Sequence, residues 1–297
     1  MNAAALLAEM RRRIVAHARP DLQTSIPRLL LSRVETQETD YSMTDPLLVV
    51  MAQGGKRLLL GEQVFEYGEG QVLVVTTGLP VTGHFLGATP QTPALGMGLV
   101  LRPATIAELL LEVPAHRWSR TAGPAITTGA AAPDLLDAVA RLLRLLDHPA
   151  DARVLAPLVE REILWRLLTG PHGAIVRQIG LADSSTSHIS RAIRWIRDNY
   201  AEPMRIEDLA RMAGMSAAAF HRHFRAVTTM SPLQFQKRIR LQEARSLLLA
   251  KPDDVAGVGH LVGYDSPSQF SREYRRLFGA PPGQDAARLR AAAPHLP

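Results

Sequence analysis

The sequence predicts an α+β protein. Its first part should form a β-barrel with flanking helices, and its last part an all-α domain of two helix-turn-helix subdomains joined by a linker helix. Short apolar segments between Gly- and Pro-containing turns fill residues 26–113, which is typical of a sandwich or barrel. Apolar residues then recur with the helical period. Finally, the last third of the chain contains one helix-turn-helix pattern twice.

The chain begins with an Ala-, Leu- and Arg-rich segment, residues 1–19, that we expect to form a lead-in helix. Its apolar stretches are too short for a secretory signal, and no run of the sequence approaches the length of a membrane span. Cysteine is absent, which excludes disulfides, thiolate metal sites and a cysteine nucleophile. We therefore expect a cytoplasmic protein that makes no membrane contact.

Six segments of the β region have the length and composition of strands. They are residues 47–52, 57–60, 63–67, 71–76, 81–86 and 94–101. Two helices should follow, over residues 133–147 and 155–168. The first of these helices carries an apolar stripe made of Leu135, Leu136, Val139, Leu142, Leu143 and Leu146.

The repeated pattern consists of a short apolar helix, a turn opened by glycine, a capping serine and a second helix with a basic face. The copies cover residues 206–227 and 255–279, about 50 residues apart. Gly214 and Gly263 stand where the first helix ends and the backbone needs positive φ. Two copies predict a protein that reads two successive major grooves of DNA.

The second helix of each copy carries the candidate DNA contacts. An aromatic stripe at i, i+4 spacing should face the core of each copy, and the candidates lie off that stripe. Arg, Gln and Ser side chains can reach base edges or phosphates, and the serines at 216 and 266 should also cap their helices. The candidates are Ser216, Ala218, His221, Arg222 and Arg225 in the first copy, and Ser266, Ser268, Gln269, Arg272 and Arg275 in the second. A single polar helix face is often only solvated, but two copies at a suitable distance favour DNA binding.

A good helix-forming segment with proline at its start joins the two copies over residues 232–250. At about 1.5 Å per residue it would form a rod of about 28 Å. Since one turn of DNA is about 34 Å long, such a spacer suits two recognition helices in adjacent grooves.

The double motif, the linker Leu233–Leu248 and the run Val262–Pro282 resemble the AraC/XylS family of bacterial transcription regulators over roughly residues 190–290. Residues 49–61 and 155–168 resemble the N-terminal domain of one AraC subgroup, which is similar to a cupin-like β-barrel. Gly257 and Gly259 depart from the family pattern, because they lie inside the first helix of the second copy.

The resemblance implies a transcription regulator of the activator type that binds double-stranded DNA as a homodimer and has RNA polymerase as a partner. The implied domains are a cupin-like sensor and dimerisation domain over residues 1–120, a helical dimerisation and linker region over 121–185, and a tandem helix-turn-helix domain over 186–297. The leucine stripe at 135–146 then has two interpretations: it packs on its own barrel, or it pairs with the same helix of a second copy.

The net positive charge of the chain comes from the part that contains the repeated motif. Residues 181–297 contain 17 Lys and Arg against 11 Asp and Glu, whereas residues 1–180 contain 17 of each. This separation supports nucleic-acid binding by the C-terminal part.

The barrel region offers no metal or catalytic set. Its histidines are His84 and, just beyond it, His116, and no nucleophile elbow, phosphate loop or paired-carboxylate pattern occurs. We expect no cofactor and no enzymatic activity. A small effector inside the barrel is the leading hypothesis, with Gln53, Lys56, Tyr67 and His84 as candidate lining residues. The alternatives are a ligand-independent regulator in which the barrel only dimerises, and a barrel enzyme with a DNA-binding tail.

Overall fold

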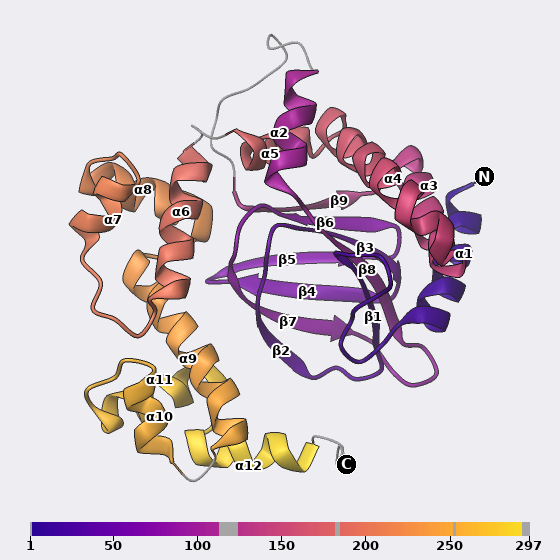
Figure 1. Cartoon of the computed structure of the whole chain (residues 1–297). Helices are drawn as coiled ribbons and strands as arrows, with labels where there is room; N and C mark the ends of the chain where they lie inside the picture. Colours follow the sequence, from indigo (N-terminus) through magenta and orange to yellow (C-terminus); the bar gives the residue numbers. More distant parts are fainter. Residues whose placement is uncertain (1, 113–123, 182–184, 252–253, 293–297) are drawn as a thin grey trace. The chain divides into compact units, whose positions relative to one another are not determined.

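The computed structural model of the chain describes residues 2–112, 124–181, 185–251 and 254–292. The chain divides into two compact units, residues 1–190 with 226–229, and residues 191–225 with 230–297. The first unit combines sheets and helices and the second is all helical, so the predicted α+β class is confirmed (Figure 1). No described helix is both long enough and apolar enough to cross a membrane.

The described strands of the first unit form two antiparallel sheets. They are β1 (Leu29–Val34), β2 (Thr39–Met43), β3 (Leu47–Gln53), β4 (Gly55–Leu60), β5 (Gln63–Gly68), β6 (Gln71–Val75), β7 (Pro80–Leu86), β8 (Ala94–Val100) and β9 (Ile126–Ala130). The order is β1-β8-β3-β6-β9 in the five-stranded sheet and β2-β7-β4-β5 in the four-stranded sheet. The described strands thus form two separate sheets, the sandwich form of the sandwich or barrel that the sequence predicted. The chain crosses from one sheet to the other after β1, β2, β3, β5, β6 and β7, and each described strand pairs only within its own sheet.

Helices cover the outer face of the five-stranded sheet (Figure 1). The described helices of this unit are α1 (Ala3–His17), α2 (Pro103–Leu111), α3 (Pro133–Arg144) with a 3-10 turn η2 (Leu145–Asp147), α4 (Pro149–Thr169) and α5 (Gly173–Gly180), and α6 (Ser185–Asp198) begins here. Apolar side chains of α1, α3 and α4 share one core with β1, β3 and β8. On the edge of this core Arg144 donates two hydrogen bonds to the Glu9 carboxylate, at 2.6 and 2.9 Å.

The leucine stripe of α3 is buried within this core. Its side chains therefore pack on their own unit, which is the first of the two interpretations from sequence. Exposed apolar side chains lie on α4 instead: Val154, Leu155 and Leu158 are 67%, 43% and 61% exposed. Residues 103–111, expected to continue the β region, form α2 because Pro103 starts a helix whose Ile106 and Leu109 face the core.

The second unit is built from two short helix pairs and a linker. Its described helices are the end of α6, α7 (Ile206–Met212), α8 (Ala217–Thr228), α9 (Pro232–Ala250), α10 (Val255–Leu261), α11 (Pro267–Phe278) and α12 (Pro282–Ala292). α9 has the bounds predicted for the linker. Its start is set by a capping box, in which Ser231 Oγ accepts from the amide of Gln234 and the Gln234 side chain accepts from the amide of Ser231.

Candidate nucleic-acid interface and effector pocket

The turns of the two helix-turn-helix copies have the same hydrogen bonds. In each copy the amide of the turn glycine bonds to the carbonyl three residues earlier, and the next amide bonds to the carbonyl five residues earlier, at 2.9–3.0 Å. Gly214 and Gly263 have φ of 64° and 88°, the left-handed region that this helix end requires. The two copies are therefore equivalent in backbone geometry as well as in sequence pattern.

The second helices start at the predicted caps. Ser216 Oγ accepts a hydrogen bond of 3.3 Å from the amide of Ala219, and Ser266 Oγ accepts one of 3.3 Å from the amide of Gln269. These bonds satisfy amides that the first helical turn leaves without an intrahelical acceptor. The caps thus fix where the candidate reading helices α8 and α11 begin.

Each reading helix buries its aromatic stripe and exposes the face opposite. Phe220 and Phe224 of α8 pack at 5.5 Å between ring centroids, and Phe270 and Tyr274 of α11 at 5.6 Å. The exposed candidates are Ser216, Ala218, His221, Arg222, Arg225, Ser266, Ser268, Arg272 and Arg275. None of the four arginines in this set forms a salt bridge with another described residue. Their guanidinium groups are therefore available to phosphates or base edges.

Gln269 differs from the other candidates, because it is half-buried and its side chain bonds to a buried carboxylate. Its Nε2 donates to Oε1 of the buried Glu273 at 3.1 Å. Glu273 also accepts from Lys237 Nζ at 2.8 Å and from the Tyr264 hydroxyl at 2.9 Å. Burial alone would raise the pKa of Glu273, but these bonds outweigh it and lower the pKa. Gln269 thus supports the carboxylate through which Lys237 of α9 holds α11, a role that its sequence position does not reveal.

A second buried carboxylate, Asp285, ties α9, α11 and α12 together. It accepts hydrogen bonds from Arg245 Nε at 2.8 Å, from the Tyr274 hydroxyl at 2.9 Å and from Arg288 Nη2 at 2.7 Å. Burial acts to raise its pKa, and the bonds from Arg245 and Tyr274 more than compensate, so the pKa is lowered. The carboxylate is therefore charged and paired, which makes it a structural element of the second copy.

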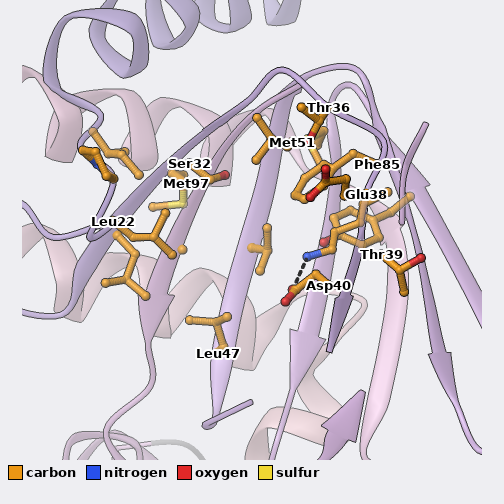
Figure 2. A pocket seen from close by; sticks show the side chains of 18 residues that line it. Leu22, Ser32, Thr36, Glu38, Thr39, Asp40, Leu47, Met51, Phe85 and Met97 are labelled. Atoms are coloured by element: carbon orange, nitrogen blue, oxygen red, sulfur yellow. Dashed lines mark ion pairs between the residues drawn. The ribbon is translucent and has the colours of Figure 1, made fainter. Parts of the chain in front are cut away.

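A cavity of about 520 Å³ opens between the two sheets of the first unit (Figure 2). Its walls are mostly apolar, with Leu47, Val49 and Met51 from β3. Volume and lining suit a small organic molecule. The cavity belongs entirely to the first unit.

Lys56 on β4 is the buried cation of this cavity. It pairs in register with Tyr67 on β5 and Phe85 on β7, so three side chains share one face of the four-stranded sheet. Its Nζ lies 3.6 Å from Asp40 Oδ2 on β2 and 4.4 Å from the centroid of the Phe85 ring. Gly83 makes this reach across β7 possible, because a Cβ there would lie 2.6 Å from Lys56 Cε.

The electrostatics of Lys56 leave capacity for an anion. Burial lowers the pKa of Lys56, and the neighbouring Asp40 only partly opposes the effect. Asp40 is itself 45% exposed and its oxygen lies beyond hydrogen-bond distance. An anionic group in the cavity could therefore give Lys56 a closer partner.

The four effector candidates from sequence are separated by the structure. Lys56 and Tyr67 line the cavity, and burial raises the pKa of Tyr67 strongly. Gln53 and His84 are not among the lining residues: Gln53 Nε2 donates to the carbonyl of Pro93 at 2.8 Å, and His84 Nδ1 lies 3.2 Å from Thr39 Oγ1. Phe85 and Asp40 could not be recognised from sequence, because their proximity to Lys56 arises from strand pairing.

No group of three or more His, Asp or Glu in the described residues has the arrangement of a metal site. His116 lies outside the described residues.

A family model described as the AraC-type transcriptional regulator N-terminus matches residues 25–175, and a helix-turn-helix domain model matches residues 209–288. The chain belongs to the AraC family of transcriptional regulators. The first match contains both sheets and all of the cavity lining except Pro20 and Leu22, and the second contains both reading helices. The resemblance noted from sequence is thereby confirmed in both parts of the chain.

The chain is similar to RhaS of Salmonella paratyphi A, an HTH-type transcriptional activator, with 27% identity over 160 residues. That match covers 51% of this chain and 56% of RhaS, so the chain spans about half the length of the curated relatives it matches. These relatives are transcription regulators rather than enzymes, in agreement with the expectation from sequence.

Among solved structures, apo ToxT of Vibrio cholerae is similar in fold, with a TM-score of 0.56 and 8% identity over 89% of this chain and 99% of ToxT. ToxT bound to an unsaturated fatty acid gives a TM-score of 0.55 and 9% identity over 90% of this chain and 97% of that chain.

Proposed function

We propose that this AraC-family protein is a sequence-specific DNA-binding transcription regulator that inserts α8 and α11 into adjacent major grooves. The observation that carries the proposal is the equivalence of the two copies: the same turn, the same cap and an exposed row with two arginines on each reading helix. The linker α9 has 19 residues and a length of about 28 Å, comparable to the roughly 34 Å of one DNA turn.

The test is fluorescence anisotropy on the upstream region of the protein's own gene, at physiological salt and against excess random duplex. Binding that survives the competitor supports specific readout. Binding that disappears with competitor, both on this duplex and on duplexes selected from a random pool, would leave only the phosphate-driven contribution and would contradict the proposal.

Within the same proposal, the cavity of the first unit binds a small amphipathic effector with an anionic group. Lys56 would meet the anion, and the leucine, valine and methionine side chains around it would cover the apolar part. The fatty-acid-bound ToxT structure supports this class of ligand. We propose that the protein activates transcription, as the name of RhaS indicates for that protein. We also propose that RNA polymerase is its partner in activation.

Thermal shift of the full chain with a panel of straight-chain and aromatic carboxylates tests the effector site. A saturable rise in the melting temperature is expected for at least one of them, with loss of the response in Lys56→Met. The exposed Lys251→Met is the matched control and should keep the response. If the carboxylates raise the melting temperature of wild type and Lys56→Met equally, Lys56 is not the anchor. If none of them raises that of wild type, the ligand-independent regulator becomes the better proposal.

The homodimer implied by the family is proposed to form through α4, because the stripe of α3 is already buried and α4 presents Val154, Leu155 and Leu158 to solvent. Sedimentation equilibrium of Leu158→Glu should show a weaker dimer than wild type. An unchanged dimer would place the interface elsewhere.

A further inference from the structure

Arg240 of the linker α9 connects the two helix-turn-helix copies. Its guanidinium donates to the carbonyls of Tyr200 at 2.6 Å, and of Ala201 and Glu202 at 3.1 Å each. These carbonyls belong to the segment that leads from α6 into the first copy. The same guanidinium donates to the carbonyl of Gly263, which is the turn glycine of the second copy.

Gly263 is in direct contact with this junction. A Cβ at this position would lie 2.2 Å from the carbonyl oxygen of Ala201 and 2.8 Å from Cζ of Arg240. The equivalent glycine of the first copy, Gly214, has no atom within 4 Å of such a Cβ. The two turns therefore share one backbone geometry, but of the two glycines only Gly263 packs against the segment that leads into the first copy.

A neighbouring side chain on α9 supports the same segment. Gln236 is buried, and its Nε2 donates to the carbonyls of Tyr200 and Glu202 at 3.0 and 2.8 Å. Arg240 bonds to this segment and to Gly263 as well, because a guanidinium carries five donors in a flat fork. A lysine has a single donor group and could not hold Gly263 and the segment in the same way.

A rigid helix sets the distance between two copies, but the rotation of the second copy about the helix axis needs a further contact. The bonds of Arg240 supply one, because a single guanidinium joins the turn at Gly263 to the adjacent segment Tyr200–Glu202.

We propose that Arg240 is a positioning residue that fixes α11 relative to α8, so that the two reading helices enter adjacent grooves as one rigid pair. The inference rests on the proposed two-groove readout. It assigns to Arg240 a role in the spacing that the protein accepts between half-sites, without contact to DNA.

The test compares three duplexes by anisotropy with the full chain. The first is a duplex selected by the wild-type protein from a random pool, the second has about five extra base pairs, half a turn, between its two half-sites, and the third has one half-site scrambled. Wild type should lose affinity strongly on the second and third. Arg240→Ala should bind the first duplex about tenfold or more weakly than wild type does, and should bind the third about as well as wild type. Its affinity should fall much less than that of wild type when the extra base pairs are inserted. Arg240→Lys should behave in the same direction, although it keeps the positive charge.

Two glycine variants control for loss of folding. Gly263→Ala and Gly214→Ala both place a side chain at positive φ, and both should lower stability. Only Gly263→Ala should reduce the effect of the insertion. The inference is overturned if Arg240→Ala keeps the full insertion effect or weakens binding to all three duplexes equally. If wild type itself shows no insertion effect, the proposed two-groove readout fails, and the inference fails with it.

Discussion

The hydroxyl of Tyr274 donates a hydrogen bond of 2.9 Å to Oδ2 of Asp285, a carboxylate with 0% exposure. Asp285→Asn should lower the free energy of unfolding by about 3–5 kcal/mol, because it removes the buried charge that pairs with Arg245 and Arg288. Chemical denaturation followed by circular dichroism measures the loss. Asp265→Asn, at an exposed position, is the control and should change stability little.

The lowered pKa of Asp285 gives this contribution a pH dependence. The unfolded chain binds a proton at a higher pH than the folded chain, so the stabilisation is present above the ordinary carboxyl pKa of about 3.9 and is lost as pH falls through the folded value. The difference in free energy of unfolding between wild type and Asp285→Asn should therefore shrink in acid. A constant difference between pH 7 and pH 3 would contradict this assignment.

Ser266 and Ser268 offer the same chemical change in two different roles. Ser266→Ala removes the cap of α11 and should cost about 1 kcal/mol of stability. Ser268→Ala, on the exposed reading face, should stay within about 0.5 kcal/mol in stability and alter DNA binding instead. Thermal unfolding and anisotropy on the same samples separate the two effects, and equal stability losses would count against the cap.

Arg222 and Arg272 occupy equivalent positions on α8 and α11. Each change to alanine should weaken binding to a specific duplex by about 1–3 kcal/mol and binding to random duplex by less. Arg211→Ala is the matched control, since this exposed arginine of α7 is paired with Asp208 at 3.0 Å. Equal losses of Arg222→Ala on specific and random duplex would reduce its role to a phosphate contact.

Lys56→Met should raise the stability of the ligand-free protein by about 1 kcal/mol, because methionine keeps the apolar stem and removes a buried charge with a distant partner. The folded pKa of Lys56 is lowered by burial, so wild-type stability should rise relative to Lys56→Met as pH increases toward the ordinary lysine pKa. Denaturation curves of the two proteins at pH 7 and pH 9.5 measure the stability difference and its change with pH. A destabilised Lys56→Met at pH 7 would show that the ion pair with Asp40 is structural.

The fold of the second unit could be predicted in detail because its determinants are local. A glycine at positive φ ends a helix, a serine caps the next, and a proline starts the linker; each acts within a few residues of the chain. The glycines in α10 show the limit of such reasoning. A Cβ at Gly259 would lie 3.1 Å from the Phe270 ring, so this glycine fits close packing of α10 on α11 that helix propensity alone does not indicate.

The candidate sites were predicted less completely, because they depend on segments distant in the sequence. Lys56 meets Asp40 and Phe85 only through the pairing of three strands, and Gln269 turns inward because Glu273 is anchored by Lys237.

The α+β class, the two helix-turn-helix copies, their caps and the length of the linker could all be predicted from sequence, since each follows from the chemistry of neighbouring residues. Long-range contacts set the other features: the sheets stay separate, the stripe of α3 is buried, Lys56 faces a cavity, and Arg240 joins Gly263 to the segment before the first copy. These features arise from strand pairing, side-chain packing and hydrogen bonds between distant residues, which no local pattern specifies.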